Sequence, residues 1–200
     1  MTKESHPFLI VLLAAVIATT PLAVDMYLPA MPQLATSLQT DGLMVQQSLS
    51  IFLAFYGIGM LVFGPLADAI GRRPLALWGL AIFFVASVLL SQTESIEWFL
   101  TWRALQAFAG SAATVVIPGI IRALYQEHTA KGMSYVSMMM MLAPLLAPAI
   151  GSLVLFVASW PWIFVVLAGY ALVIGGFAAK FLPEINTKAE RGKLDFFGSY

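Results

Sequence analysis

The sequence of 200 residues contains no cysteine and only two histidines, His6 and His128, both of which lie in polar stretches between apolar runs. Without thiols the chain forms no disulfides and no thiolate metal sites. No histidine lies within an apolar run, where it could serve as a buried base, metal ligand or proton relay. We therefore expect neither a metal site nor a cofactor.

Charged side chains are also scarce. They make up 10% of the residues, against roughly 25% in soluble domains, whereas apolar residues make up 60%. The mean hydropathy is +0.90. Ten basic and ten acidic residues give a formal net charge of zero, so no basic face is available for nucleic acid. This composition predicts an integral membrane protein with the lipid bilayer as its surroundings.

The charged residues divide the sequence into apolar runs, whose lengths predict the number of spanning helices. Four runs suit one crossing each, although Arg103 interrupts the fourth, and the last run of 48 residues requires two. Within the last run, residues 158–162 contain a helix-ending proline between two tryptophans suited to the membrane interface. We therefore expect an all-α membrane protein with six transmembrane helices. The runs are residues 5–24, 42–67, 74–93, 98–121 and 132–179.

The basic residues predict the orientation in the membrane. If the N-terminus is cytoplasmic, nine of the ten basic residues fall on the cytoplasmic side, and the tenth, Arg103, lies in the membrane. The other connections, residues 31–44, 92–97 and 158–161, hold no lysine or arginine. The nine are Lys3, Arg72, Arg73, Arg122, Lys131, Lys180, Lys188, Arg191 and Lys193.

The C-terminal tail is polar from residue 186 and turns apolar at residues 194–198, as though a further segment were beginning. We therefore expect residues 1–184 to form a six-helix transmembrane bundle. Residues 185–200 would begin a cytoplasmic linker toward a missing C-terminal half.

Two charged residues lie at similar depths below the same membrane surface. Asp25 lies about 7.5 Å inside the predicted end of the first helix, and Arg103 lies about 9 Å inside the fourth. A carboxylate at that depth costs about a few kcal/mol unless it is protonated, paired or wetted, which favours a function over a boundary marker. Either the two residues form a structural ion pair, or Asp25 gains and loses a proton beside Arg103. Gln106 lies one turn after Arg103 and faces the same way.

Residues 64–74 join the second and third predicted helices. This connection is short enough to require a tight turn, which Gly71 permits and Pro74 closes. Asp68 and Arg72 are four residues apart and can pair with each other or with neighbouring helix ends. Taken alone, the segment is a charged loop that obeys the positive-inside rule.

Four segments together resemble a known family. Residues 64–74 (GPLADAIGRRP) resemble the loop signature of the major facilitator superfamily, and residues 100–110 (LTWRALQAFAG) resemble its fourth-helix motif around a buried arginine. Residues 25–32 (DMYLPAMP) and 143–152 (APLLAPAIGS) resemble the Bcr/CflA-type multidrug efflux branch of its drug:proton antiporters. The matches occur in the expected order and extend over essentially the whole chain.

The resemblance implies the N-terminal half of a 12-helix transporter of the bacterial cytoplasmic (inner) membrane, exchanging drug-like molecules for protons. It assigns proton coupling to Asp25 and Arg103, with Gln106 and Tyr27 as further candidates in the cavity, although Tyr27 is equally suited to packing. Ala69 replaces a basic residue of the loop motif, which weakens one contact. The implied cytoplasmic latch is Gly64, Asp68, Gly71, Arg72 and Arg73, and the exporter-motif helix carries Pro144, Pro148 and Gly151.

The residues of the exporter motif and the methionines before it also have physical interpretations. Two prolines four apart bend a helix, and small residues let a neighbour approach closely. Residues 138–141 are four methionines, which suit a cavity for varied apolar ligands, although lipid contact explains most of the run.

Three alternatives to drug export are an importer of a small metabolite, a six-helix structural membrane protein and an intramembrane enzyme. The enzyme is disfavoured because Ser111 has no histidine or lysine within an apolar run to activate it. We therefore do not expect an enzyme.

Overall fold

The computed structural model describes residues 7–125 and 129–183. The predictions for Lys3, His6, His128, Lys188, Arg191, Lys193 and the linker at 185–200 lie outside these residues. The elements, in order, are α1 (Pro7–Asp25), η1 (Leu28–Ala30), α2 (Met31–Ser37), α3 (Gly42–Ile70), α4 (Arg72–Ser91), α5 (Ile96–Tyr125), α6 (Thr129–Val157) and α7 (Pro161–Phe181).

The prediction of an all-α membrane protein is confirmed. Within the described ranges, six helical segments are long and apolar enough to cross a membrane. The first of them continues from Phe8 to Ser37 through α1, η1 and α2. A helix satisfies its backbone hydrogen bonds internally, which is why apolar runs of this length adopt it in lipid.

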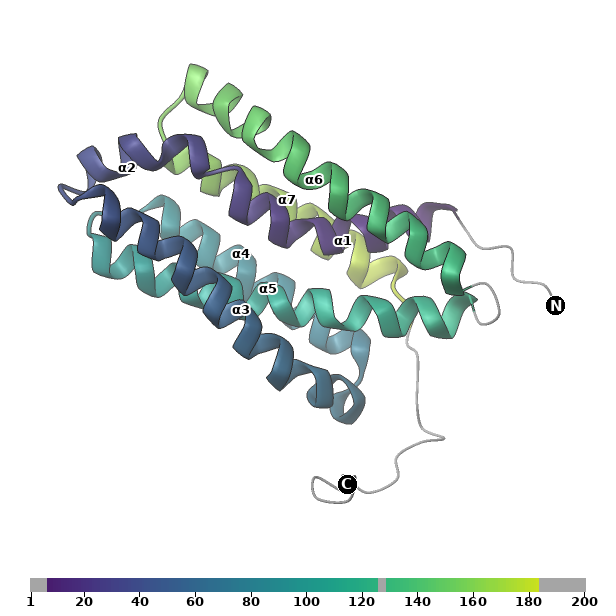
Figure 1. The fold of residues 1–200 in the computed structure, drawn as a ribbon. Coiled ribbons are helices and arrows are strands. Elements are labelled where there is room, and N and C mark those ends of the chain that lie inside the picture. The colour runs from purple at the N-terminus through teal and green to yellow at the C-terminus, as the bar shows by residue number, and fades with distance from the viewer. Residues whose placement is uncertain (1–6, 126–128, 184–200) are drawn as a thin grey trace.

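Helix α5 lies at the centre of the bundle. It packs along α3 and α4, while α4 also packs on α7, and α1 contacts α5, α6 and α7. Figure 1 shows α3 and α6 along opposite edges of the bundle. In the 18-residue apolar stretch of each spanning helix, the share of residues buried inside the protein is 67% for α5 but only 11% for α3 and 17% for α6. The two edge helices therefore direct most of their apolar surface away from the bundle.

The first spanning segment breaks after Asp25, and proline explains the break. Pro29 has no N–H to bond the carbonyl of Asp25 four residues earlier, and its ring crowds that carbonyl. The chain then makes a turn at Met26 and Tyr27 before the short 3-10 helix η1. We predicted residues 31–37 as part of a connection, and this was wrong because Leu34 is buried in the core, which stabilises them as α2.

A single residue, Gly71, joins α3 to α4. Its φ of +102° and ψ of 148° lie in a region that side chains with a Cβ rarely adopt. The predicted tight turn is therefore confirmed, but the expected role of Pro74 was wrong. Pro74 lies in the first turn of α4, where its missing N–H leaves no intrahelical bond unmade.

The predicted hairpin between the last two helices lies between Val157 and Pro161. Trp162 is exposed, as expected at a membrane interface, but Trp160 is buried and packs edge-on against Phe99 and Phe164. The Trp160 backbone N–H also donates to the side-chain Oε1 of Gln33 at 3.0 Å, which ties α2 to this hairpin.

Candidate functional site

Arg103 lies in the N-terminal third of α5, on its buried face, and has no exposed surface. Its Nη1 donates to the carbonyl oxygen of Ala23 at 3.0 Å and to Oε1 of Gln106 at 2.8 Å. The centre of the guanidinium lies 4.2 Å from the centroid of the Tyr27 ring and 4.4 Å from that of Phe52. The rings and the carbonyl at the end of α1 together stabilise a cation that has left water.

Gln106 carries the network from Arg103 into α4. Its Nε2 donates to Oγ of Ser87 at 2.8 Å, and Ser87 donates to the carbonyl oxygen of Phe83 at 2.7 Å. Both Gln106 and Ser87 are completely buried. Gln106, predicted to face the same way as Arg103, therefore bonds to it, and the network continues through a serine that we did not predict.

Tyr27 connects the break in the first spanning segment to α3. Its hydroxyl lies 3.1 Å from Oγ of Ser48, which itself donates to the carbonyl of Val45 at 2.6 Å. Because the Ser48 proton is used in that bond, Tyr27 is the donor of the pair. The Tyr27 side chain is fully buried, so its ring holds Arg103 in place and does not line an open cavity in this conformation.

Asp25 is the last residue of α1 and is partly exposed. It shares its depth with Arg103, because the carbonyl that Arg103 binds belongs to Ala23, two residues earlier. In the part of the chain that the structure describes, the one ion pair joins Arg72 and Asp68, so a structural ion pair between Asp25 and Arg103 is absent. Arg103 uses the backbone of the same helix end instead, so no cation among residues 7–125 and 129–183 lies within 4 Å of the Asp25 carboxylate.

The break is held from a second side by α6, which contains Pro144, Pro148 and Gly151. A Cβ on Gly151 would overlap the carbonyl oxygen of Met26, so only glycine allows this approach. Gly151 is buried, and Ala147, one turn earlier, belongs to the same core cluster as Met26. The predicted close approach of a neighbouring helix at the exporter motif is thus present, and the neighbour is the end of α1.

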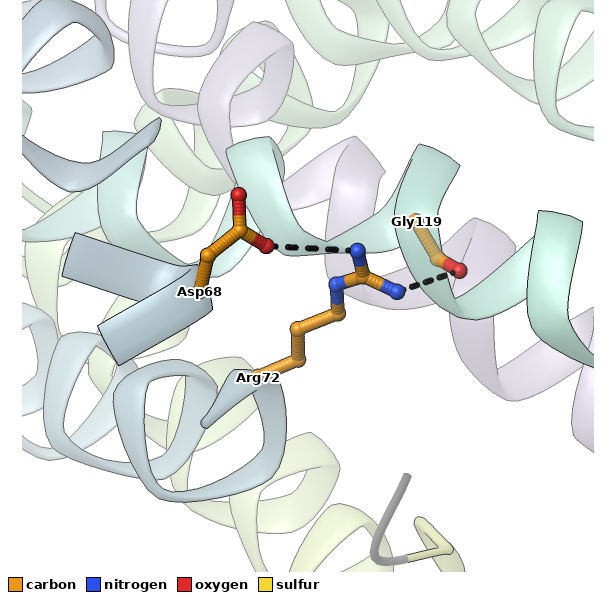
Figure 2. A network of polar contacts seen from close by, with 3 residues as sticks. All are labelled: Asp68, Arg72 and Gly119. Carbon is orange, nitrogen blue, oxygen red and sulfur yellow. Dashed lines mark hydrogen bonds and ion pairs between the residues drawn. The ribbon is translucent and has the colours of Figure 1, made fainter. Parts of the chain in front are cut away.

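A second polar cluster lies at the junction of α3 and α4 (Figure 2). Arg72 donates from Nη1 to the carbonyl oxygen of Gly119 at 2.9 Å, and its Nη2 lies 3.3 Å from Oδ1 of Asp68. The Asp68 side chain is 69% exposed and that of Arg72 is 22% exposed. Arg73 donates to the carbonyl of Ala179 in α7. The two arginines therefore tie α4 to α5 and to α7.

Other predicted residues lie apart from these clusters. A Cβ on Gly64 would meet nothing within 4 Å, so this position has room for a side chain. Met138, Met140 and Met141 are exposed on α6. An open apolar groove of about 560 Å³ lies between α3 and α5, and neither Asp25 nor Arg103 lines it. The groove residues are Ile51, Phe55, Ile58, Leu100, Thr101, Ala104, Leu105 and Phe108.

Sequence reasoning missed Ser87, Ser48 and Gly119 as partners in these clusters. The two serines are polar residues within apolar runs, and this was an available signal. Gly119 takes part through its carbonyl, so its side chain gave no signal.

Comparison with known proteins agrees with the resemblance of the motifs. Residues 13–195 match the family model of the Major Facilitator Superfamily. The chain is 30% identical to the "Bicyclomycin resistance protein homolog" of Haemophilus influenzae, over 96% of this chain and 48% of that protein. It is 35% identical to the "Chloramphenicol resistance protein" of Pseudomonas aeruginosa, over 86% of this chain and 41% of that protein.

A third relative is the "Multidrug resistance protein MdtL" of Vibrio parahaemolyticus, 33% identical over 85% of this chain and 43% of that protein. The chain therefore spans about half the length of the curated relatives it matches. Its six spanning helices correspond to one half of such a transporter. Because residues 13–195, nearly the whole chain, match the family model, the chain belongs to the Major Facilitator Superfamily.

Proposed function

We propose that this chain forms the N-terminal half of a proton-coupled antiporter that exports small amphipathic drugs across the bacterial cytoplasmic membrane. The observation that carries the proposal is the partly exposed carboxylate of Asp25 at the break beside buried Arg103, with no cation from the described residues within 4 Å. Three relatives with names of antibiotic or multidrug resistance support drugs as the substrate class.

In this proposal Asp25 takes up and releases the proton, and Arg103 supplies a fixed positive charge. The guanidinium stays with the Ala23 carbonyl and the two rings while Asp25 is protonated. When the proton leaves, the new negative charge lies close to an existing positive one, which limits the cost of a charge in a low-dielectric site. For an uncharged drug, a membrane potential of about 100 mV supplies about 2.3 kcal/mol per proton, equivalent to a drug gradient of about 50-fold.

The proposed orientation places the N-terminus and the junction of α3 and α4 in the cytoplasm. Arg72, Arg73, Arg122, Lys131 and Lys180 all lie near helix ends that would face the cytoplasm, in keeping with the positive-inside rule. The latch role proposed for Asp68, Arg72 and Arg73 follows from the bonds that tie α4 to its neighbours there. Residues 1–184 would then be the bundle, and residues 185–200 would lead to the partner half.

The test is efflux of a fluorescent cationic dye from cells that carry the full-length gene, with and without a protonophore. We expect the wild type to extrude dye, and both Asp25→Asn and the protonophore to abolish extrusion while the protein remains in the membrane. Glu97→Gln is the matched control, because it removes an exposed carboxylate at a helix end away from the site. Normal, protonophore-sensitive efflux by Asp25→Asn would assign the coupling to another residue.

A further inference from the structure

A second pocket lies at the end of the bundle opposite Arg72, where α4 ends and α5 begins. It is open and has a volume of about 600 Å³. None of the residues assigned above to coupling, latch or exporter motif lines it. The lining residues are Leu89, Gln92, Thr93, Glu94, Ser95, Trp98 and Trp102.

The aromatic wall of this pocket is a stacked pair of tryptophans. The rings of Trp98 and Trp102 have centroids 5.4 Å apart and planes inclined by 17°. They lie one turn apart on α5, and Trp98 is 58% exposed. Indole faces attract organic cations more strongly than other aromatic rings do, and the faces of the stacked pair that are turned away from each other offer apolar surface to a ligand.

Glu94 supplies the charge at the edge of this wall. Its side chain is exposed, and no protein cation lies within 4 Å of it among the residues that the structure describes. Two neighbouring hydroxyls are already engaged locally. Thr93 donates to the carbonyl of Leu89 at 2.8 Å, and Ser95 accepts from the backbone N–H of Trp98 at 3.5 Å. The free carboxylate is therefore the group that gives the pocket its preference for charge.

We propose that this Glu94 pocket binds lipophilic organic cations at the membrane surface. The cation lies against the carboxylate and the indole faces, and its apolar body lies along Leu89 and the tryptophans. An exported drug and the ammonium head of an aminophospholipid share this chemistry. The proposal does not rest on transport by the protein, since it concerns binding at a pocket apart from Asp25.

The experiment measures binding of tetraphenylphosphonium to the purified protein in dodecyl maltoside, a detergent without charge, by equilibrium dialysis. We expect Glu94→Gln to weaken binding about three-fold and the double variant Trp98→Leu with Trp102→Leu to weaken it about five-fold. Glu97→Gln removes the same charge three residues away, outside the pocket lining, and is expected to bind as the wild type does. The neutral analogue triphenylphosphine oxide is expected not to compete.

Two results would overturn the proposal. Unchanged binding by Glu94→Gln, with the protein eluting as a single monodisperse species, would show that the carboxylate attracts no cation. Equal losses in Glu94→Gln and Glu97→Gln would show a general effect of surface charge.

A further arm adds short-chain phosphatidylethanolamine: competition identifies a lipid head group as the natural ligand, and lack of competition identifies a dissolved cation. If the wild type binds phosphonium as expected but extrudes no dye, the result contradicts the proposed transport function and leaves the Glu94 pocket in place.

Discussion

Arg103 donates to the carbonyl oxygen of Ala23 at 3.0 Å, and it makes no ion pair with Asp25, the acidic residue at the same depth. The arginine thus acts on the end of α1 through the backbone. Its charge is held by aligned peptide dipoles and two aromatic rings, and the carboxylate remains available for other chemistry. This arrangement separates the residue that holds the helix break from the residue proposed to titrate.

The first prediction concerns the polar chain from Arg103 to Ser87. Gln106→Leu removes the acceptor of a charged donor in a buried site, so we expect the free energy of unfolding to fall by about 1.5–3 kcal/mol. Ser87→Ala removes two neutral bonds, one from Gln106 and one to the Phe83 carbonyl, and should cost about 1–2 kcal/mol. Unfolding by sodium dodecyl sulfate in mixed micelles measures both. Gln47→Leu, an exposed glutamine on α3, is the control and should change stability by less than about 0.5 kcal/mol.

The second prediction compares two glycines within helices. Gly151→Ala places a methyl group against the Met26 carbonyl, so α1 and α6 must separate, and we expect a loss of about 1–3 kcal/mol. Gly64→Ala adds the same group where nothing lies within 4 Å and should be neutral, or stabilising by up to about 1 kcal/mol through helix propensity. The same unfolding assay applies. Equal stabilities of the two variants would mean that α6 does not contact the Met26 carbonyl closely at Gly151.

The third prediction separates the two partners of Arg72. Asp68→Asn breaks an exposed pair and should cost less than about 1 kcal/mol, an effect that disappears in 0.5 M salt by screening. Arg72→Ala also removes the bond to the Gly119 carbonyl from a mostly buried donor, so its cost should be larger, about 1.5–3 kcal/mol, and persist in salt. Unfolding at low and high salt measures both. Matching losses that vanish together in salt would assign the whole effect to the ion pair.

The number of spanning helices could be predicted because a bilayer leaves the backbone few options. In lipid, about twenty apolar residues without a charge have to form a helix, because only a helix satisfies their backbone hydrogen bonds within the segment. The extra helix α2 escaped prediction because its stability comes from Leu34 in the core, which is a tertiary effect. Likewise Trp160 has the composition of an interface residue but packs on Phe99 and Phe164 inside the bundle.

The site could be predicted by residue but not by contact. Helix geometry placed Asp25 and Arg103 at one depth, and the hydrogen bond to Ala23 agrees with this. Helix geometry alone could not show whether Arg103 binds a carboxylate or a backbone carbonyl. That depends on how Pro29 ends α1 and on which rings surround the guanidinium. Phe52 in particular could be recognised as aromatic but not as the second face of a cation site.

Gly71 connects α3 directly to the residue that anchors α4 on α5, because the next residue, Arg72, bonds to the Gly119 carbonyl. Ile70 ends α3 and Arg72 begins α4, so two peptide units, at most about 7 Å of chain, separate them. Such a short connection cannot lengthen when one helix moves relative to the other. Of the six spanning helices, α3 has the smallest fraction of its apolar stretch buried. We therefore expect any tilt of α3 to be transmitted through Gly71 to the start of α4, where Arg72 bonds to the Gly119 carbonyl.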